Sequence, residues 1–302
     1  DIAVVTALGD IPIHVEFYSG PEAVAKEKIK IVQALEPEGY AVLNFDDSTV
    51  LGMKSKCKGK VLTFGFGEGA DVRITSFLNR SEFGKPLGIS FKIETKDNFV
   101  PVRIDDVFGK SQAYAGAGAA TVGLIRGVNL VKISEALLQY RGERGRGRLI
   151  EGVKSSYIID DTYNASPLST VAALDILGDL SAPRKVAILG DMKELGKYTT
   201  YIHEKIGRTV ARNADVLVTV GLKARFIAEG ARKSGFSKKN IYSFENSEGG
   251  KIDILNLIES RDLILVKGSQ SMRMETIVLK IMAHPELAKE LLVRQYGKWL
   301  KS

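Results

Sequence analysis

The second half of the sequence alternates short apolar segments with stretches of helical periodicity, and this alternation constrains the fold more than any other feature. Strands that alternate with helices of roughly ten to fifteen residues form right-handed βαβ units around a parallel sheet. We therefore expect a doubly wound α/β fold for this half. The strand-like segments are residues 157–160, 185–189, 216–220, 241–244 and 263–267, and the last helix is expected over about 273–283.

A basic, glycine-rich stretch separates this half from the first. Residues 142–148, within "YRGERGRGRLIEG", have the composition of a linker. We therefore expect one domain over residues 1–141 and a second over residues 149–302. The first domain is expected to contain strands over 2–8, 40–45 and 60–66, β-rich segments over 72–104, and helices over 21–35, 109–126 and 133–140.

Composition narrows the class of protein. The chain has 302 residues and one cysteine, Cys57, which excludes an internal disulfide and suits a reducing cytoplasm. It shows neither a run of about 18 apolar residues nor a secretory leader, and its amphipathic end is expected to pack on its own domain rather than on a membrane. The net charge of +7 suits anionic small substrates or an ordinary solvated surface, whereas the scattered Lys and Arg argue against nucleic acid. The first residue, Asp1, lies in an expected strand, so we expect that an earlier part was removed or omitted.

Three of the expected strands in the second half end in charged residues. Asp161 ends "YIIDD", Asp191 follows "AILG", and Lys267 ends "ILVK". Carboxyl ends of parallel strands lie at one edge of a sheet, where open α/β folds bind their ligands. A shared ligand-binding edge explains these endings better than three separate turns. Gly268 and Ser269 resemble a small anion-binding turn at a helix N-terminus.

His14 and Lys28 are the candidate reactive groups of the first domain. A lone histidine is more often structural than a ligand. Lys28 follows Val24 by four residues on the apolar stripe that also contains Val32 and Leu35. A lysine there either extends its ammonium group to solvent or is buried, which would favour a neutral amine available for chemistry. Both readings are open at this point.

Five motifs resemble the Mur ligases. "IIDDTYNASPLSTVAAL", "AILGDMKELG" and "ILVKGSQSMRMETIV" resemble the C-terminal domain of these enzymes, most closely that of the members that add D-Ala-D-Ala. "DIAVVTALGDIPIHVEFYSGPEAVAKEK" and "AVLNFDD" resemble their central domain. The resemblance implies an incomplete central ATP-binding domain followed by a Rossmann-like C-terminal ligase domain.

The resemblance also implies an activity. Such enzymes are cytoplasmic, ATP-dependent amide ligases of peptidoglycan precursor synthesis. With ATP and Mg²⁺ they convert a carboxylate of UDP-MurNAc-tripeptide to an acyl phosphate, which the amine of D-Ala-D-Ala then attacks. A monomer is expected.

Residue roles follow from the same resemblance. His14 would help bind magnesium, and Lys28, fourteen residues later, would be carbamylated and contact the metal through its carbamate. Asp161 would bind the ribose of ATP and Arg146 its phosphates. The full set implied at the nucleotide is Asn44, Arg146, Asp161, Tyr163 and Asn164. The set implied near the incoming dipeptide is Asp191, His203, Lys267 and Ser269.

The sequence also departs from the family pattern. The family has a P-loop, and "FGKS" (108–111) is not one, because Ile104 stands where the first glycine belongs. Ser111, Gln112 and Ala115 replace the family's His-Asn and a second Asn that contacts adenine, so weaker nucleotide binding is expected. We therefore expect this chain to be inactive alone. The alternatives are a sister ligase of folylpolyglutamate or cyanophycin type, and a non-catalytic fragment that binds a nucleotide or a partner.

Overall fold

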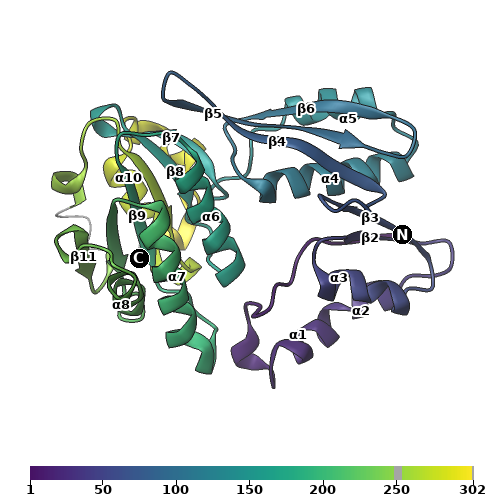
Figure 1. Ribbon diagram of the computed structural model, residues 1–302, viewed down its shortest axis with the longest axis horizontal. Helices are drawn as coiled ribbons and strands as arrows, with labels where there is room; N and C mark the ends of the chain where they lie inside the picture. The colour runs from purple at the N-terminus through teal and green to yellow at the C-terminus, as the bar shows by residue number, and fades with distance from the viewer. Residues whose placement is uncertain (248–253, 301–302) are drawn as a thin grey trace. The chain divides into compact units, whose positions relative to one another are not determined.

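The computed structural model describes residues 1–247 and 254–300. The chain divides into two compact units (Figure 1). The first comprises residues 1–80 and 87–141, and the second comprises residues 81–86 and 142–302. Within the described ranges, no helix is both long enough and apolar enough to cross a membrane.

The first unit is built on a six-stranded mixed sheet with the strands in sequence order. The first four strands pair in parallel, and the last two pair antiparallel. The strands are β1 (Ile2–Val5), β2 (Tyr40–Asn44), β3 (Lys60–Gly65), β4 (Val72–Glu82), β5 (Lys85–Glu94) and β6 (Phe99–Asp105). The helices are α1 (Pro21–Lys28), α2 (Lys30–Gln33), α3 (Ser48–Gly52), α4 (Lys110–Ile125) and α5 (Leu130–Leu138).

The helix expected over residues 21–35 is interrupted at Ile29, where α1 ends and α2 begins. Ile29, Ile31 and Val32 are β-branched, and such residues lose side-chain freedom in a helix. Val24 and Val32 are buried as expected, but Lys28 is exposed. The interpretation of Lys28 as a desolvated amine is therefore wrong, because the last residue of α1 does not continue the buried stripe.

The second unit contains a six-stranded sheet in the order β11-β10-β9-β12-β8-β7. The first five strands in this order are parallel to one another, as the sequence predicted, and β7 pairs antiparallel with β8. The sequence analysis missed β7 because its four residues follow the glycine-rich stretch. The strands are β7 (Arg148–Glu151), β8 (Tyr157–Asp161), β9 (Lys185–Gly190), β10 (Val216–Val220), β11 (Ile241–Phe244) and β12 (Leu263–Lys267).

Helices cover both faces of this sheet, which is why its inner strands β9, β10 and β12 are buried along nearly their whole length. On one face, Ile188 and Val266 share a core with Ile277 and Val278 of α10. On the other face, α6 contacts β9 and β12. Helix α7 packs against α6, and α8 packs against α7 (Figure 1). These helices are α6 (Pro167–Asp179), α7 (Thr199–Asn213), α8 (Arg225–Lys233) and α10 (Glu275–Ile281).

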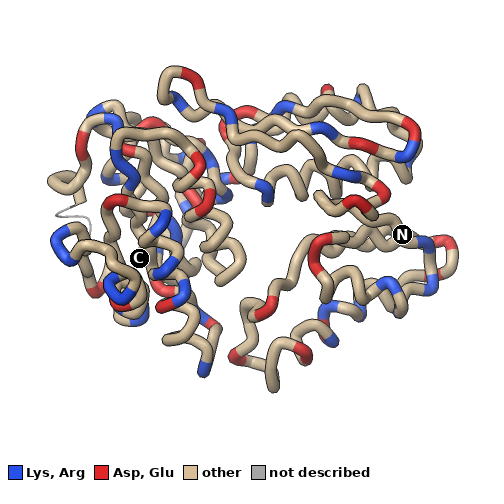
Figure 2. The backbone as a smooth tube through the Cα atoms, viewed as in Figure 1, with Lys and Arg blue, Asp and Glu red and all other residues tan. Residues whose placement is uncertain are grey.

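The segment after α10 consists of short pieces rather than one amphipathic helix. It contains α11 (Ala288–Leu291) and 3-10 turns over Pro285–Leu287 and Gly297–Leu300. Acidic and basic residues are interspersed along both units (Figure 2).

Candidate functional site

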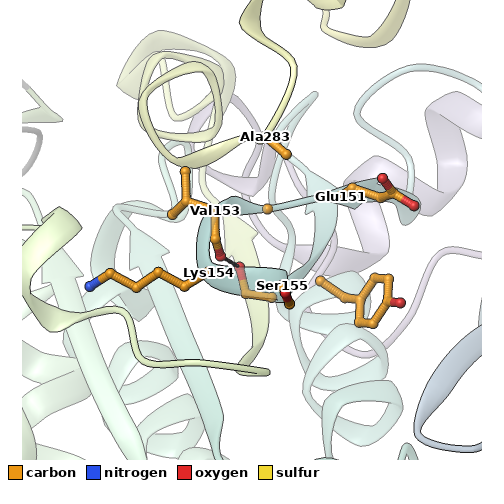
Figure 3. Close-up of a pocket in the computed structure, with 8 residues that line it drawn as sticks. Glu151, Val153, Lys154, Ser155 and Ala283 are labelled. Atoms are coloured by element: carbon orange, nitrogen blue, oxygen red, sulfur yellow. Dashed lines mark hydrogen bonds between the residues drawn. The ribbon is translucent and has the colours of Figure 1, made fainter.

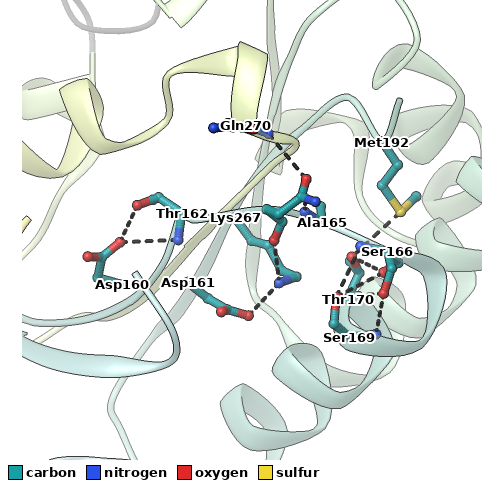
Figure 4. A network of polar contacts seen from close by, with 11 residues as sticks. Asp160, Asp161, Thr162, Ala165, Ser166, Ser169, Thr170, Met192, Lys267 and Gln270 are labelled. Carbon is teal, nitrogen blue, oxygen red and sulfur yellow. Dashed lines mark hydrogen bonds and ion pairs between the residues drawn. The ribbon is translucent and has the colours of Figure 1, made fainter. Parts of the chain in front are cut away.

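The carboxyl end of β8 carries the centre of the candidate site. Asp161 is the last residue of β8, and Lys267 is the last residue of the neighbouring strand β12, which puts them side by side in parallel register. Lys267 Nζ lies 2.5 Å from Asp161 Oδ2 and donates to the carbonyl of Asn164 at 3.0 Å (Figure 4). The Lys267 side chain is 2% exposed, so its charge lies inside the unit and is paired with the Asp161 carboxylate.

The loop between β8 and α6 is closed by hydrogen bonds at both ends. Asn164 Oδ1 accepts from the main chain of Ala165 at 2.9 Å and of Gln270 at 3.3 Å, which joins this loop to the one after β12. Ser166 then caps α6 through a reciprocal pair with Ser169 (Figure 4). The Asn164 hydrogen bonds and the Ser166 cap together hold the loop that contains Tyr163 and follows Asp161.

Asp160 lies beneath this loop and is fully buried. Its Oδ1 accepts from Thr162 Oγ1 at 2.6 Å and from the Thr162 main chain at 3.2 Å (Figure 4). No hydrogen-bond partner within the described residues reaches Oδ2. Burial, aided by the nearby charges of Asp161 and Glu275, raises the pKa of Asp160 to about 7 even though the Thr162 bonds lower it.

Asp191 joins the loops after β9, β10 and β12. Its Oδ1 accepts from the main chain of Lys223 at 3.0 Å and of Ala224 at 2.7 Å, and its Oδ2 lies 2.8 Å from Lys193 Nζ. Its carbonyl accepts from the Ser269 main chain at 3.0 Å, and Ser269 Oγ accepts from the Lys193 main chain at 2.8 Å. The structure therefore brings Asp191, Ser269, Asp161 and Lys267 to one edge of the sheet.

His203 supports the loop after β9 from within the core. It is fully buried on α7, its Nδ1 lies 2.7 Å from the Thr199 carbonyl, and its Nε2 accepts from the Met192 main chain at 3.1 Å. Burial lowers its pKa, so the imidazole is neutral with the proton on Nδ1. Both nitrogens are engaged internally, which suits a residue that orients the Asp191–Met192 turn.

The glycine-rich linker is attached to the β8 loop. Gly147 donates to the Asp160 carbonyl at 2.9 Å, and Tyr163 donates to the Gly145 carbonyl at 3.0 Å. Gly145 has φ +66°, and a Cβ there would meet the Tyr163 nitrogen at 2.9 Å, so the turn requires glycine. The exposed Arg146 guanidinium stacks 3.9 Å from the centre of the Tyr163 ring. The cation is thereby held against the loop that follows Asp161.

A buried ionic cluster next to this loop was missed by the sequence analysis. Glu275 is fully buried between Arg273, at 2.6 Å, and Arg294, at 2.9 Å. The run "MRME" places Arg273 and Glu275 two residues apart, which could have suggested a pair, but nothing in the sequence connects them to Arg294.

The first unit contains the other three predicted site residues. Asn44 is 4% exposed, and its amide donates to the Thr6 carbonyl at 2.7 Å and accepts from the Asp46 main chain at 2.9 Å. His14 has a left-handed backbone with φ 72°. Within the described residues, no three His, Cys, Asp or Glu side chains gather as a metal site. Mg²⁺ prefers oxygen ligands, which a carbamate on Lys28 would supply beside His14, and this site stays a prediction.

A pocket of about 480 Å³ in the second unit lies at the other end of β8 (Figure 3). Residues 151–157 and Ala283 line it. These residues surround the start of β8, whereas Asp161 ends that strand. The pocket is therefore separate from the candidate site.

Comparison with known proteins identifies the family. Residues 1–122 match the Mur ligase middle domain, and residues 145–270 match the Mur ligase glutamate ligase domain. The chain belongs to the Mur ligase family. The expected α/β fold, with a Mur ligase central domain followed by a C-terminal ligase domain, is thereby confirmed.

Relatives of this Mur ligase chain are longer than the chain. The UDP-N-acetylmuramoyl-tripeptide–D-alanyl-D-alanine ligase of Bacillus subtilis is 29% identical over an alignment of 293 residues that covers 94% of this chain and 60% of that protein. A crystal structure of MurF from Acinetobacter baumannii has 27% identity and a TM-score of 0.77, over 92% of this chain and 58% of that one. The MurF ligase of Thermotoga maritima in complex with ADP shares the fold, with a TM-score of 0.78 and 24% identity over 96% of this chain and 62% of that one.

The positions that depart from the Mur ligase pattern lie on α4 of the first unit. Ser111 and Ala115 are exposed and stand four residues apart on one helical face, with Gln112 partly buried beside them. No atom of Ala115 beyond its main chain can donate or accept a hydrogen bond. Weaker adenine binding at this face stays a prediction, as do the roles assigned above to individual site residues.

Proposed function

We propose that this chain forms the nucleotide- and amine-binding part of an ATP-dependent ligase that adds D-Ala-D-Ala to UDP-MurNAc-tripeptide. The observation that carries the proposal is the similarity over 94% of the chain to a ligase named for that reaction. The site at the carboxyl ends of β8, β9 and β12 supports it, because Mur-type motifs meet there in space. We further propose a cytoplasmic monomer that uses ATP with Mg²⁺.

The residues of the second unit supply binding and orientation. Asp161 presents carboxylate oxygens suited to ribose hydroxyl groups, and its ion pair with Lys267 fixes the direction of that carboxylate. Arg146 supplies a positive charge for phosphate oxygens once it leaves the Tyr163 ring. Asp191, Ser269 and His203 hold the neighbouring loops in place, which suits positioning of the incoming amine.

ATP would supply the phosphoryl group that activates the substrate carboxylate. We propose that turnover also requires parts of the relatives that this chain does not span, and that Lys28 acts as a carbamate together with His14 only in that setting. The 302-residue chain alone should therefore bind nucleotide weakly and release no phosphate.

The test is phosphate release by the protein that contains this chain, supplied with ATP, Mg²⁺ and UDP-MurNAc-tripeptide. Release should depend on D-Ala-D-Ala, and glutamate should not replace it. Asp161→Asn should raise the KM for ATP. Asp215→Asn is the matched control, because Asp215 accepts from the Lys185 main chain at the opposite end of the sheet.

Two outcomes would contradict the proposal. Use of glutamate in place of D-Ala-D-Ala would assign the chain to a sister ligase of folylpolyglutamate or cyanophycin type. Nucleotide binding without turnover, with any amine offered to the protein that contains this chain, would indicate a non-catalytic binding protein.

A further inference from the structure

The geometry points to Arg294 as a positioning residue of the nucleotide site, one that anchors the C-terminal segment to the loop after β8. Arg294 lies 131 residues from Tyr163 in the sequence, yet its guanidinium binds the main chain of that loop. The inference rests on the proposed function, since it assigns Arg294 to the nucleotide site proposed there.

The contacts of Arg294 are directed at the loop itself. Nη1 donates to the Thr162 carbonyl at 3.3 Å, and Nη2 donates to the Tyr163 carbonyl. These two carbonyls directly follow Asp161. Arg294 is 5% exposed, and the planar guanidinium group offers donors in a fixed fork that a lysine cannot reproduce.

The backbone of Arg294 shows that its position is imposed by these contacts. Its φ of 59° lies in the left-handed region, which residues other than glycine rarely adopt and which is strained for an arginine. Such a conformation persists where surrounding contacts over-determine it. Here those contacts are the two loop carbonyls and the carboxylate of Glu275.

Glu275 connects this arginine to the rest of the C-terminal segment. Its two oxygens are divided between Arg273 and Arg294, so each arginine has one contact with this buried carboxylate. Arg273 also donates to the Trp299 carbonyl at 2.7 Å, and both guanidinium groups face the Trp299 ring, at 5.3 and 5.7 Å. The segment after α11 is thus fastened beside the loop.

The loop is held on its other side by Asp160, which binds the Thr162 hydroxyl and main chain. The Thr162 carbonyl therefore accepts a hydrogen bond from Arg294, and the Thr162 hydroxyl donates one to Asp160. Loss of Arg294 would remove the hydrogen bonds to the carbonyls of Thr162 and Tyr163. The main chain of this loop would then be freer to move, and the adjoining Asp161 would shift as well. A ligand held by Asp161 would then lose its orientation.

Arg184 provides a matched control within the same unit. It also binds buried Asp262, at 2.9 and 2.7 Å, and donates to the Leu257 carbonyl at 2.6 Å. It precedes β9 and so lies at the amino ends of the strands. Arg184→Ala should therefore destabilise the unit without disturbing the loop after β8.

The experiment compares the 302-residue chain with its Arg294→Lys, Arg294→Ala and Arg184→Ala variants. Amide hydrogen exchange of residues 161–165 is followed by mass spectrometry, ADP affinity by calorimetry, and folding by thermal melts. Arg294→Lys keeps the charge beside Glu275 and so guards against loss of the fold. We expect both Arg294 variants to exchange faster in this loop and to bind ADP about tenfold more weakly, which corresponds to about 1.4 kcal/mol.

Arg184→Ala should lower the melting temperature while its loop exchange and ADP affinity stay at wild-type values. If both Arg294 variants match Arg184→Ala in loop exchange and in ADP affinity, the positioning role is overturned. If the wild-type chain does not bind ADP, the proposed nucleotide site fails, and the exchange data still decide whether Arg294 orders the loop.

Discussion

Buried charges around the loop after β8 differ in how they are neutralised. Lys267 faces Asp161, and Glu275 lies between two arginines, so each is compensated by an opposite charge. Among the residues that the structure describes, the Asp160 carboxylate accepts only from Thr162, and other carboxylates lie nearby. Because a buried group without a counter-charge favours its neutral form, these residues respond differently to pH and to substitution.

Asp160 should make stability fall as the pH rises. An unfolded aspartate has a pKa of about 3.9, whereas burial raises the pKa of Asp160 to about 7. Between these values the folded chain binds more protons than the unfolded chain, so the free energy of unfolding decreases with pH and levels off above about pH 7. In Asp160→Asn the free energy of unfolding should depend less on pH. Urea unfolding at about pH 5 and pH 8 measures this dependence. If the free energy of unfolding changes between these pH values by the same amount in Asp160→Asn as in the wild type, the effect does not come from Asp160.

The Lys267–Asp161 pair should show strong coupling. Lys267→Met leaves a carboxylate without its partner and should lower the free energy of unfolding by about 3–5 kcal/mol. The double variant with Asp161→Asn should recover much of this loss, which a double-mutant cycle measures. Lys193→Met is the control, since the Lys193 side chain is 39% exposed and its pair with Asp191 should contribute only about 0–1 kcal/mol. Additive effects of the Lys267 and Asp161 substitutions would contradict the coupling.

At the scale of elements, close helix packing is what holds α7 against α8. A Cβ on Gly207 would lie 2.1 Å from the Ile227 carbonyl, and one on Gly230 would lie 2.1 Å from the Glu204 carbonyl. Each glycine therefore lets the other helix approach at main-chain distance, and a methyl group would force the helices apart.

Gly207→Ala and Gly230→Ala should each lower the free energy of unfolding by about 1–3 kcal/mol, because the added methyl overpacks the interface. Gly52→Ala should instead raise it by about 0.4–1 kcal/mol, because Gly52 is helical and has open space around its Cβ position. Chemical denaturation of the three variants provides the measurement. A stabilising effect at Gly207 would show that the interface can relax.

The broken helix α1–α2 separates Lys28 from the apolar stripe to which sequence spacing assigned it. Lys28→Ala should change the free energy of unfolding by no more than about 0.5 kcal/mol, because the side chain is exposed. Val24→Ala is the matched change on the same helix and should cost about 1–3 kcal/mol, since Val24 is 1% exposed. A loss at Lys28 as large as that at Val24 would indicate a buried role for the lysine.

At the scale of the whole molecule, each unit has its own hydrophobic core. The core built on β8–β12 and α10 lies within the second unit, and the cores built on β1–β6 lie within the first. A compact region with its own core can fold independently.

Residues 142–302 expressed alone should therefore unfold in a single cooperative thermal transition. The same region without residues 292–302 should melt lower, because Arg294 and its contacts with Glu275 and the β8 loop are lost. Circular dichroism and calorimetry measure both. A gradual, non-cooperative melt of residues 142–302 would show that this region depends on the first unit.

Features of the fold that arise from local residue patterns could be predicted from the sequence. The five parallel strands and the polar residues at their carboxyl ends follow from period and composition, because a strand buried on both faces must be apolar along its length. That Asp161, Asp191 and Lys267 lie at one edge of the sheet was predictable for the same reason, since parallel strands end on the same side.

What the sequence determined by itself was therefore the alternation of elements, the division of the chain near residue 142 and the motifs at the strand ends. Only the tertiary structure decided that Lys28 is exposed, that His203 has both nitrogens engaged inside the core, and that Glu275 binds Arg294. Burial and long-range ion pairs depend on which distant segments pack together. Arg294 meets Thr162 from 132 residues away, and no local pattern encodes that encounter.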